Sequence, residues 1–243
     1  MQLLISVVNA GEVEAALAGG ADILDIKNPG EGSLGAPAPG LIRQIRRLAP
    51  RPQPVSVAIG DMPNLPGTAA LAALGAAACG ADYVKVGLWG PRTTSEAETL
   101  LREVGAALQE APRCAVIAAA YADAGRTGTL DPRLLPRIAE RAGAAGCLID
   151  TAIKDGHRLL DFLAPEELQV LAQQAHAAGL LFALAGALEE TDLLVLRDLG
   201  ADVAGIRSAA CRDGHRAGPL DAGRVRRLHA MLIGGGIPQA AHA

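Results

Sequence analysis

One phrase returns three times along this chain: GGADILDIK at 19–27, CGADYVKVG at 79–87 and LGADVAGIR at 199–207, with AAGCLIDT at 144–151 as a looser copy. Each copy follows a stretch rich in Ala, Leu, Glu and Arg, which is typical of a helix. The glycine before Ala-Asp suits a helix C-terminus, because only glycine enters the left-handed region without steric cost. An apolar run of strand length follows it. The unit is the helix-to-strand turn of an α/β barrel.

Eight alternations of strand and helix fit into the 243 residues. The expected strands are 2–8, 22–27, 54–59, 82–87, 114–121, 146–150, 180–185 and 202–207. The expected helices are 10–18, 39–48, 67–78, 94–109, 132–143, 165–178, 189–198 and 221–231. This order predicts one domain, a (β/α)8 TIM barrel over residues 1–233, with 234–243 as a loose C-terminal tail. A doubly wound open sheet is the alternative, but it usually carries a glycine-rich phosphate loop after its first strand.

The composition excludes several classes of function. A formal charge of −4 and a pI near 5.7 give no basic surface for nucleic acid or an anionic membrane. The apolar runs are of strand length and the N-terminus lacks a basic signal segment, so we expect a cytoplasmic protein with no membrane partner. The four cysteines form no CxxC pair and are expected to be small buried residues. No GxGxxG, Walker or HExxH motif occurs, so no metal or nucleotide cofactor is expected.

The lysines are the most informative residues for chemistry. Only three of the 22 basic residues are lysines, namely Lys27, Lys85 and Lys154, and each lies at or just after an expected strand. A lysine amine can lose its proton, whereas an arginine guanidinium effectively cannot. Lysines retained in an arginine-rich chain therefore indicate Schiff-base or proton-transfer chemistry.

Strand alternation brings the charged residues together. Asp25 and Lys27 share the face that points to the barrel axis, Lys85 points the same way, and Asp150 is aimed at the mouth with Lys154 in the following loop. Crowded and buried ammonium groups disfavour each other's charge, so one amine becomes a nucleophile or base near neutral pH. We expect these five residues to be catalytic. The alternative is a set of structural ion pairs, Asp25–Lys27 and Asp150–Lys154, that merely fill the barrel.

One connection is unusually long. NPGEGSLGAPAP, at 28–39, follows Lys27 and carries three glycines. Long ordered loops inside compact domains are usually functional, so this one is expected to act as a lid or substrate clamp over the mouth. A merely flexible loop is the alternative.

The last two strands suggest an anion site. Gly186 and Gly205 would let backbone N–H groups approach a phosphate, and Arg207 and Ser208 would add charge and a hydroxyl. A plain tight turn explains Gly186 equally well. After the fifth strand, YADAGRTG supplies residues that either bind substrate or cap the next helix, namely Tyr121, Asp123 and Arg126.

Several of these motifs resemble one family. DILDIKNPGEGSLGA, DYVKVGL, YADAGR, IDTAIKDG, ALAGAL and GIRSAACRDGHR are similar to those of the (5-formylfuran-3-yl)methyl phosphate synthases of methanofuran biosynthesis, over residues 3–216. The resemblance implies a TIM barrel that condenses two molecules of glyceraldehyde 3-phosphate with loss of phosphate and water, without a cofactor. It also implies that Lys27 forms the Schiff base and Lys85 accepts a proton, with Asp150 and Lys154 assisting. Ser208 and His215 depart from the family pattern.

Two other functions stay open at this level. An ordinary class I aldolase would use the same imine on a phosphosugar, and a non-catalytic barrel would bind a phosphosugar without turnover. The expected partner is thus a small triose phosphate, for methanofuran or an analogue of it. Because such barrels often associate, a homo-oligomer is also expected.

Overall fold

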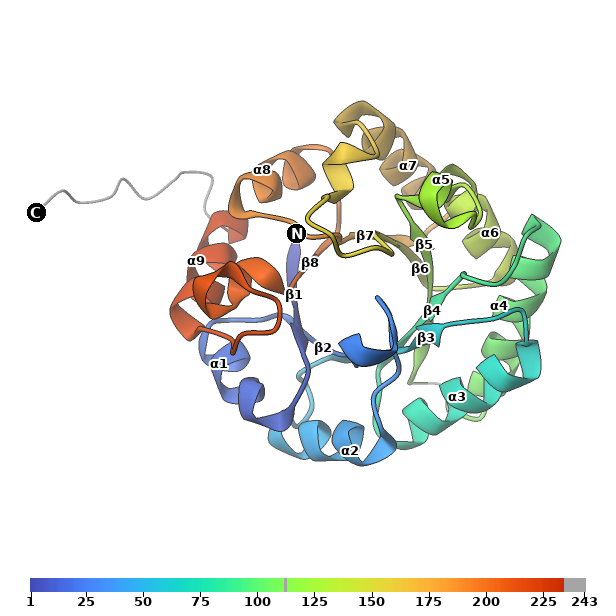
Figure 1. Ribbon diagram of the computed structural model, residues 1–243. Coiled ribbons are helices and arrows are strands. Elements are labelled where there is room, and N and C mark those ends of the chain that lie inside the picture. Colours follow the sequence, from blue (N-terminus) through green and yellow to red (C-terminus); the bar gives the residue numbers. More distant parts are fainter. Residues whose placement is uncertain (112, 234–243) are drawn as a thin grey trace, which may run out of the picture.

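Eight parallel strands close into a barrel in chain order, β1 to β8, in the computed structural model, which describes residues 1–111 and 113–233 (Figure 1). The strands are β1 (Gln2–Val7), β2 (Ile23–Ile26), β3 (Val55–Asp61), β4 (Tyr83–Gly87), β5 (Ala115–Tyr121), β6 (Gly146–Asp150), β7 (Leu181–Leu184) and β8 (Val203–Ile206). Pairing of β1 with β8 closes the ring. The predicted TIM barrel is therefore confirmed, and the open-sheet alternative is wrong.

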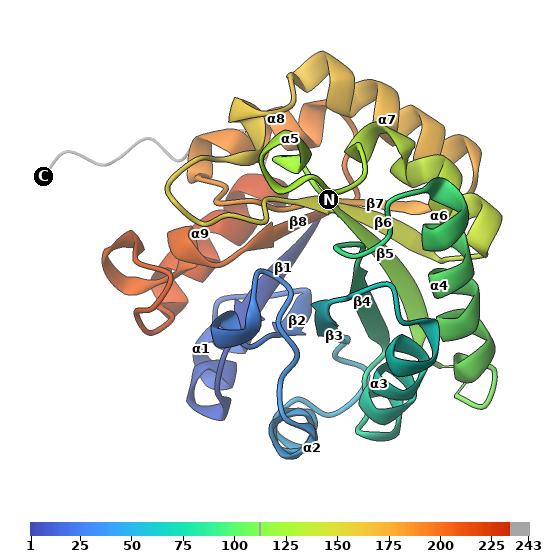
Figure 2. The same cartoon turned by 45° about the vertical axis from the view of Figure 1, so that its right-hand side comes forward.

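Helices form an outer ring around the strands (Figure 1 and Figure 2). They are α1 (Val13–Ala18), α2 (Pro39–Leu48), α3 (Pro66–Ala78), α4 (Thr94–Leu108), α5 (Ala124–Thr127), α6 (Leu135–Ala142), α7 (Pro165–Ala177), α8 (Glu190–Asp198) and α9 (Ala222–Ile233). All but the short α5 were expected from the sequence. The first and fifth expected helices begin with 3-10 turns, at Ala10–Glu12 and Pro132–Leu134. The tail expected at 234–243 lies outside the described residues.

The repeated Gly-Ala-Asp has a clear structural role at the N-terminal end of the barrel. Its glycine has a positive φ in every copy, between 92° and 104°. Its aspartate accepts a hydrogen bond from a backbone N–H of the preceding strand, which ties neighbouring strands together. The three bonds are Leu3 N to Asp22 (2.7 Å), Val55 N to Asp82 (2.9 Å) and Phe182 N to Asp202 (2.8 Å).

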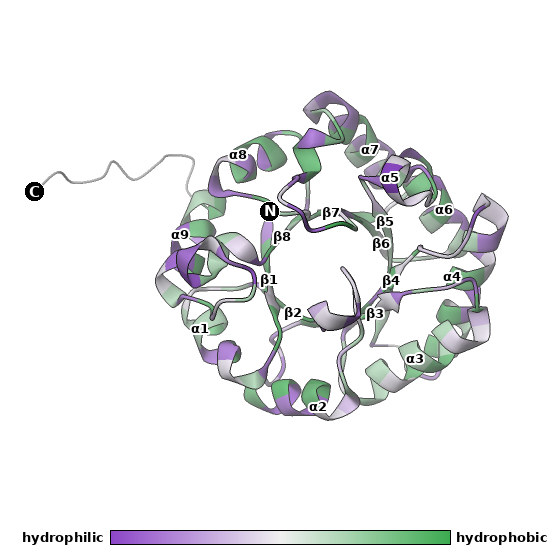
Figure 3. Cartoon of the chain, viewed as in Figure 1, coloured by the Kyte–Doolittle hydropathy of each residue, from purple (hydrophilic) through white to green (hydrophobic). Residues whose placement is uncertain are grey.

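The main core lies between the strands and the helix ring. In Figure 3, α2, α7 and α8 carry hydrophobic and hydrophilic bands, as expected for helices with one face on the barrel. All four cysteines are buried and free, as predicted. Among the described residues no helix is both long and apolar enough to cross a bilayer.

A second, smaller cluster lies inside the barrel. It contains Ala58, Ile117, Ala119, Tyr121 and Leu148, which come from β3, β5 and β6, together with Leu34 from the loop after β2. A cavity lies beside this cluster, and Ile117 and Leu148 belong to both.

Candidate active site

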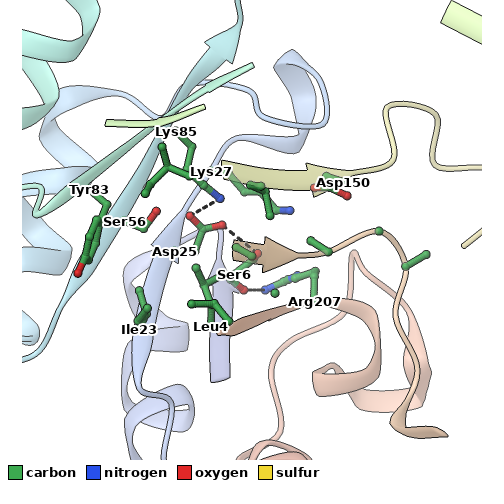
Figure 4. A pocket seen from close by; sticks show the side chains of 18 of the residues that line it. Leu4, Ser6, Ile23, Asp25, Lys27, Ser56, Tyr83, Lys85, Asp150 and Arg207 are labelled. Carbon is green, nitrogen blue, oxygen red and sulfur yellow. Dashed lines mark hydrogen bonds and ion pairs between the residues drawn. The ribbon is translucent and has the colours of Figure 1, made fainter. Parts of the chain in front are cut away.

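All three lysines line one cavity inside the barrel, and Figure 4 shows two of them, Lys27 and Lys85. The cavity has a volume of about 170 Å³ and also exposes Asp25 and Asp150. It reaches the loops that follow β6, β7 and β8. The five charged residues therefore line one cavity, as predicted: strand alternation aims Asp25, Lys85 and Asp150 at the barrel axis, Lys27 directly follows β2, and Lys154 reaches the cavity from the loop after β6.

Asp25 and Lys85 form a buried ion pair. Their side chains, on β2 and β4, approach to 2.6 Å between Asp25 Oδ1 and Lys85 Nζ, and Ser6 on β1 donates its hydroxyl to Asp25 Oδ2 at 3.1 Å (Figure 4). The pairing of Asp25 with Lys27, which belonged to the alternative of structural ion pairs, is therefore wrong. Ser56 on β3 lies between the two strands, and its short side chain leaves room for Lys85 to reach across.

Lys27 is left without a partner. Its side chain is buried, with 6 % of the residue exposed, and within residues 1–111 and 113–233 it makes no ion pair or hydrogen bond. Burial lowers the pKa of Lys27 to about 8; Asp150 and Asp25 oppose the shift, whereas the ammonium groups of Lys85 and Lys154 add to it. Lys27 is therefore an amine that is partly neutral near physiological pH.

Asp150 and Lys154 form the second pair. Lys154 Nζ lies 2.6 Å from Asp150 Oδ1 and 3.0 Å from the hydroxyl of Thr151. Burial alone would raise the pKa of Asp150, but Lys154 and Lys27 outweigh it, so the pKa lies below its usual value. The Asp150–Lys154 ion pair, which the alternative of structural ion pairs included, is thus present beside the cavity.

Arg207 lines the cavity, but its guanidinium is fully engaged. All five of its N–H groups donate within the chain. The acceptors are both carboxylate oxygens of Glu12 (2.6 and 2.9 Å) and the carbonyl oxygens of Ser6 (3.0 Å), Arg216 (2.9 Å) and Gly218 (3.0 Å). No N–H group of Arg207 is left to bind a phosphate. Arg207 therefore fixes the loop after β8 to β1.

The other expected phosphate residues lie around one corner of the cavity. Gly186, Gly205 and Ser208 all line it, and so does Arg216, which makes no ion pair in the described part of the chain. Gly186 and Ala187 both have positive φ, of 117° and 50°. Their backbone N–H groups donate no hydrogen bond among the described residues. Free N–H groups beside an arginine are what an anion site requires.

Tyr121, Asp123 and Arg126 do not line the cavity. Tyr121 is fully buried, and its hydroxyl donates to Asp61. Arg126 pairs with Asp155 at 2.6 Å, on the loop after β6. Asp123 accepts from the N–H groups of that same loop, at 2.7 Å from Ala152 and 2.9 Å from Ile153, and makes no cap on α5. Asp123 and Arg126 therefore hold the loop after β6 in place, and Tyr121 contacts Asp61 at the end of β3.

Some residues of the site were not anticipated. Asp61 ends β3 and binds the loop after β2, and Ser56 points its hydroxyl into the cavity without a partner in the described residues. A serine at an inward position of the apolar run PVSVAI was the available signal for Ser56. The sequence carried no comparable signal for Asp61, because an acidic residue at the end of a strand is also common in ordinary loops. Among the described residues, no three His, Cys, Asp or Glu side chains are grouped to hold a metal ion.

A closed barrel of eight parallel strands with three lysines around one cavity defines a TIM-barrel protein. The comparisons then give the family. The family model described as 4-HFC-P synthase matches residues 3–229, and the chain belongs to that family.

Relatives named (5-formylfuran-3-yl)methyl phosphate synthase match along nearly their whole length. The one from Methanopyrus kandleri is 48 % identical, over 95 % of this chain and 98 % of that protein. The one from Methanothermobacter thermautotrophicus is 46 % identical, over 96 % and 99 %.

Solved structures show the same fold at lower identity. Phosphoribosyl anthranilate isomerase from Thermus thermophilus has a TM-score of 0.62 at 20 % identity, covering 96 % of this chain and 98 % of its own. A 3-hexulose-6-phosphate synthase has a TM-score of 0.63 at 18 % identity, covering 94 % and 99 %. At these identities the likeness concerns the barrel alone.

Proposed function

We propose that this chain is a (5-formylfuran-3-yl)methyl phosphate synthase that condenses two molecules of glyceraldehyde 3-phosphate through a Schiff base on Lys27. The names of its relatives support the product. The main support for a Schiff-base mechanism is the buried, unpaired amine of Lys27, whose pKa is lowered to about 8. Only a neutral amine attacks a carbonyl, and this amine is neutral in a useful fraction of molecules.

The proposed chemistry begins at the carbonyl of the first triose phosphate. The Lys27 amine adds to it and water leaves, which gives an iminium ion. The iminium acidifies the neighbouring C–H, and the Asp25–Lys85 pair, 2.6 Å across, receives that proton. The resulting enamine attacks the aldehyde of the second triose phosphate and forms the carbon–carbon bond.

Eliminations and ring closure complete the furan. The Asp150–Lys154 pair at the rim can donate and accept protons as oxygen atoms leave. Two triose phosphates minus one phosphate and two water molecules give the atoms of the product, and hydrolysis frees Lys27. The balance needs no external oxidant or reductant, which agrees with the expectation that no cofactor takes part.

We place the phosphate groups at the corner formed by Gly186, Gly205, Ser208 and Arg216. All four line the same cavity as Lys27. Arg216 takes the role that the sequence suggested for Arg207, because the N–H groups of Arg207 are already donated.

Trapping with borohydride tests the proposal. Reduction in the presence of glyceraldehyde 3-phosphate should fix the mass of the substrate on the peptide that contains Lys27, and Lys27→Met should show no adduct. Without reductant, the protein should release inorganic phosphate and form a conjugated aldehyde that absorbs ultraviolet light. An adduct on Lys27 without phosphate release would favour a class I aldolase, and an adduct on another residue would overturn the assignment.

A further inference from the structure

The loop after β2, which we call the mouth strap (residues 28–38), lies across the barrel opening (Figure 1). It leaves β2 immediately after Lys27 and folds back on itself, because the N–H of Asn28 donates to the carbonyl of Gly35 at 2.9 Å. The close return requires glycine, since a Cβ on Gly35 would lie 2.1 Å from the oxygen of Asn28. The strap is thus a closed loop whose base is at Lys27.

Leu34, near the end of the strap, is a core residue of the barrel interior. It is fully buried in the cluster with Ala58 of β3 and Tyr121 of β5. Ile26 pairs with Val57 in the β2–β3 ladder, so Ala58 occupies the next position up, beside Lys27. Leu34 therefore packs inside the barrel over β3 and β5, against the cluster that contains Ala58, which lies level with Lys27.

Asp61 holds the strap in this position. Its carboxylate accepts from the N–H of Ser33 at 2.9 Å and from that of Leu34 at 3.3 Å, and it also accepts the hydroxyl of Tyr121. Gly32 makes the approach possible, since a Cβ there would lie 2.1 Å from Asp61 Oδ2.

A further bond anchors the strap to the opposite wall. The hydroxyl of Ser33 donates to the carbonyl of Thr151, next to Asp150, at 2.8 Å. The strap is therefore bonded to β3 and to the β6 end, with an apolar side chain between. Releasing the strap would expose Leu34 and break these bonds, so the strap is held in place at the mouth of the barrel.

We propose that Asp61 is a positioning residue, which fixes the mouth strap so that Leu34 keeps water away from the amine of Lys27. The proposal deepens the proposed function, because it rests on Lys27 as the nucleophile. Asp61 does not line the cavity and therefore acts through the strap. Burial is the largest cause of the lowered pKa of Lys27, and a wall that excludes water supplies burial.

The direction in which the pKa of Lys27 changes in an Asp61 variant distinguishes a positioning role of Asp61 from a direct effect of its charge. The charged groups facing Lys27 are Asp25, Lys85, Asp150 and Lys154, and none of their ion pairs involves Asp61. Removing the negative charge of Asp61 would by itself lower the pKa of a nearby ammonium. Loosening the strap admits water, which favours the ammonium and raises the pKa.

Competitive acetylation of the lysines across the pH range tests the proposal without any substrate. With three lysines in the chain, peptide masses follow each one separately. In the unaltered protein Lys27 should be half-labelled near pH 8. In Asp61→Asn the half-labelling pH should rise by about one unit, which lowers the neutral fraction at pH 7.5 about eightfold.

Two further variants keep the test decisive if Asp61→Asn does not fold. Leu34→Ala should raise the half-labelling pH in the same way, and Tyr121→Phe, which changes no charge, should raise it less. Asp202→Asn is the matched control, because Asp202 also accepts a backbone N–H, that of Phe182, but at the other end of the barrel. It should leave the labelling of Lys27 unchanged.

A half-labelling pH that stays or falls in folded Asp61→Asn and Leu34→Ala would overturn the proposal. A failure of the proposed function would look different: Lys27 would still label near pH 8, but no borohydride adduct with glyceraldehyde 3-phosphate would form on it.

Discussion

Asp25 and Lys85 reach across the barrel from β2 and β4 to within 2.6 Å of each other, and their pairing leaves the amine of Lys27 alone. The cavity therefore holds a neutral ion pair, a second pair at the rim and one unpaired lysine. Two of the lysines are suited to proton transfer beside a carboxylate. The third is suited to nucleophilic attack, because its side chain makes no ion pair or hydrogen bond within the described residues and its burial lowers its pKa.

The buried Lys27 should cost the protein stability at neutral pH. Its pKa is about 8 in the folded chain and near 10.5 when unfolded, so the unfolded chain binds more protons between these values. The lowered pKa of Lys27 corresponds to a loss of about 3 kcal/mol in the free energy of unfolding. This loss has its maximum below pH 8 and disappears as the pH rises toward 10.5. Lys27→Met should therefore unfold at a higher urea concentration than the unaltered protein at pH 7, with the gain shrinking by pH 10.

Lys154→Met is the control for that measurement. Lys154 is paired with Asp150, so its loss should destabilise the protein at pH 7. A Lys27→Met protein that is less stable at pH 7 and shows no pH dependence would contradict the assignment of a buried, unpaired ammonium.

Much of this architecture could be predicted because its causes are local. The Gly-Ala-Asp repeat marks three helix-to-strand turns within nine residues of sequence each, and alternation alone aims Lys27 and Lys85 inward. The short strands were located to within two residues, because turn residues bound them closely. The alternation of side chains along a strand and the residues that form its turns are local features of the sequence. They therefore predict the strand positions and inward-facing side chains without knowledge of long-range contacts.

The partners of each charge could not be predicted, because they depend on contacts between distant segments. Arg207 binds Glu12, 195 positions earlier, and that single pairing turns an expected phosphate ligand into a structural residue. Whether Asp25 would bind Lys27 or Lys85 depended on how far a side chain reaches across β3. The burial of Leu34 was equally hidden, since one leucine in a loop rich in glycine and proline carries no periodic signal.

Asp25→Asn should separate the roles of the two inner lysines. Lys85 would lose its buried partner, at a cost of roughly 3–5 kcal/mol in the free energy of unfolding. Asp25 also raises the pKa of Lys27, so its removal should lower the half-labelling pH of Lys27 below 8. Product formation should fall about 100-fold while Lys27 still forms the imine, because the proton acceptor is damaged and the nucleophile is not.

Asp150→Asn provides the comparison for that result. Asp150 raises the pKa of Lys27 as well, but the variant leaves the Asp25–Lys85 pair intact. If both variants lose proton transfer from the enamine-forming carbon equally, as measured by exchange of substrate hydrogen with deuterated water, the pair is not the acceptor.

Arg207→Gln should weaken the fold more than it weakens binding at the phosphate corner. The change leaves the buried carboxylate of Glu12 and three carbonyl groups without their donor. We expect a loss of roughly 3–5 kcal/mol in chemical unfolding. If the stability is unchanged and only the KM for triose phosphate rises, the guanidinium binds substrate and the internal bonds are dispensable.

Arg216→Gln should show the opposite behaviour. The side chain lines the cavity beside Ser208 and makes no ion pair in the described part of the chain, so its removal should leave the unfolding midpoint nearly unchanged. A charge-assisted bond to phosphate contributes about 1.5–3 kcal/mol, so the dissociation constant of inorganic phosphate, measured by calorimetry, should rise at least about tenfold. The acetylation profile of Lys27 should stay the same, because Arg216 is not among the charges that shift it. Unaltered phosphate binding in Arg216→Gln, with loss of binding in Arg207→Gln at retained stability, would move the anion site back to Arg207.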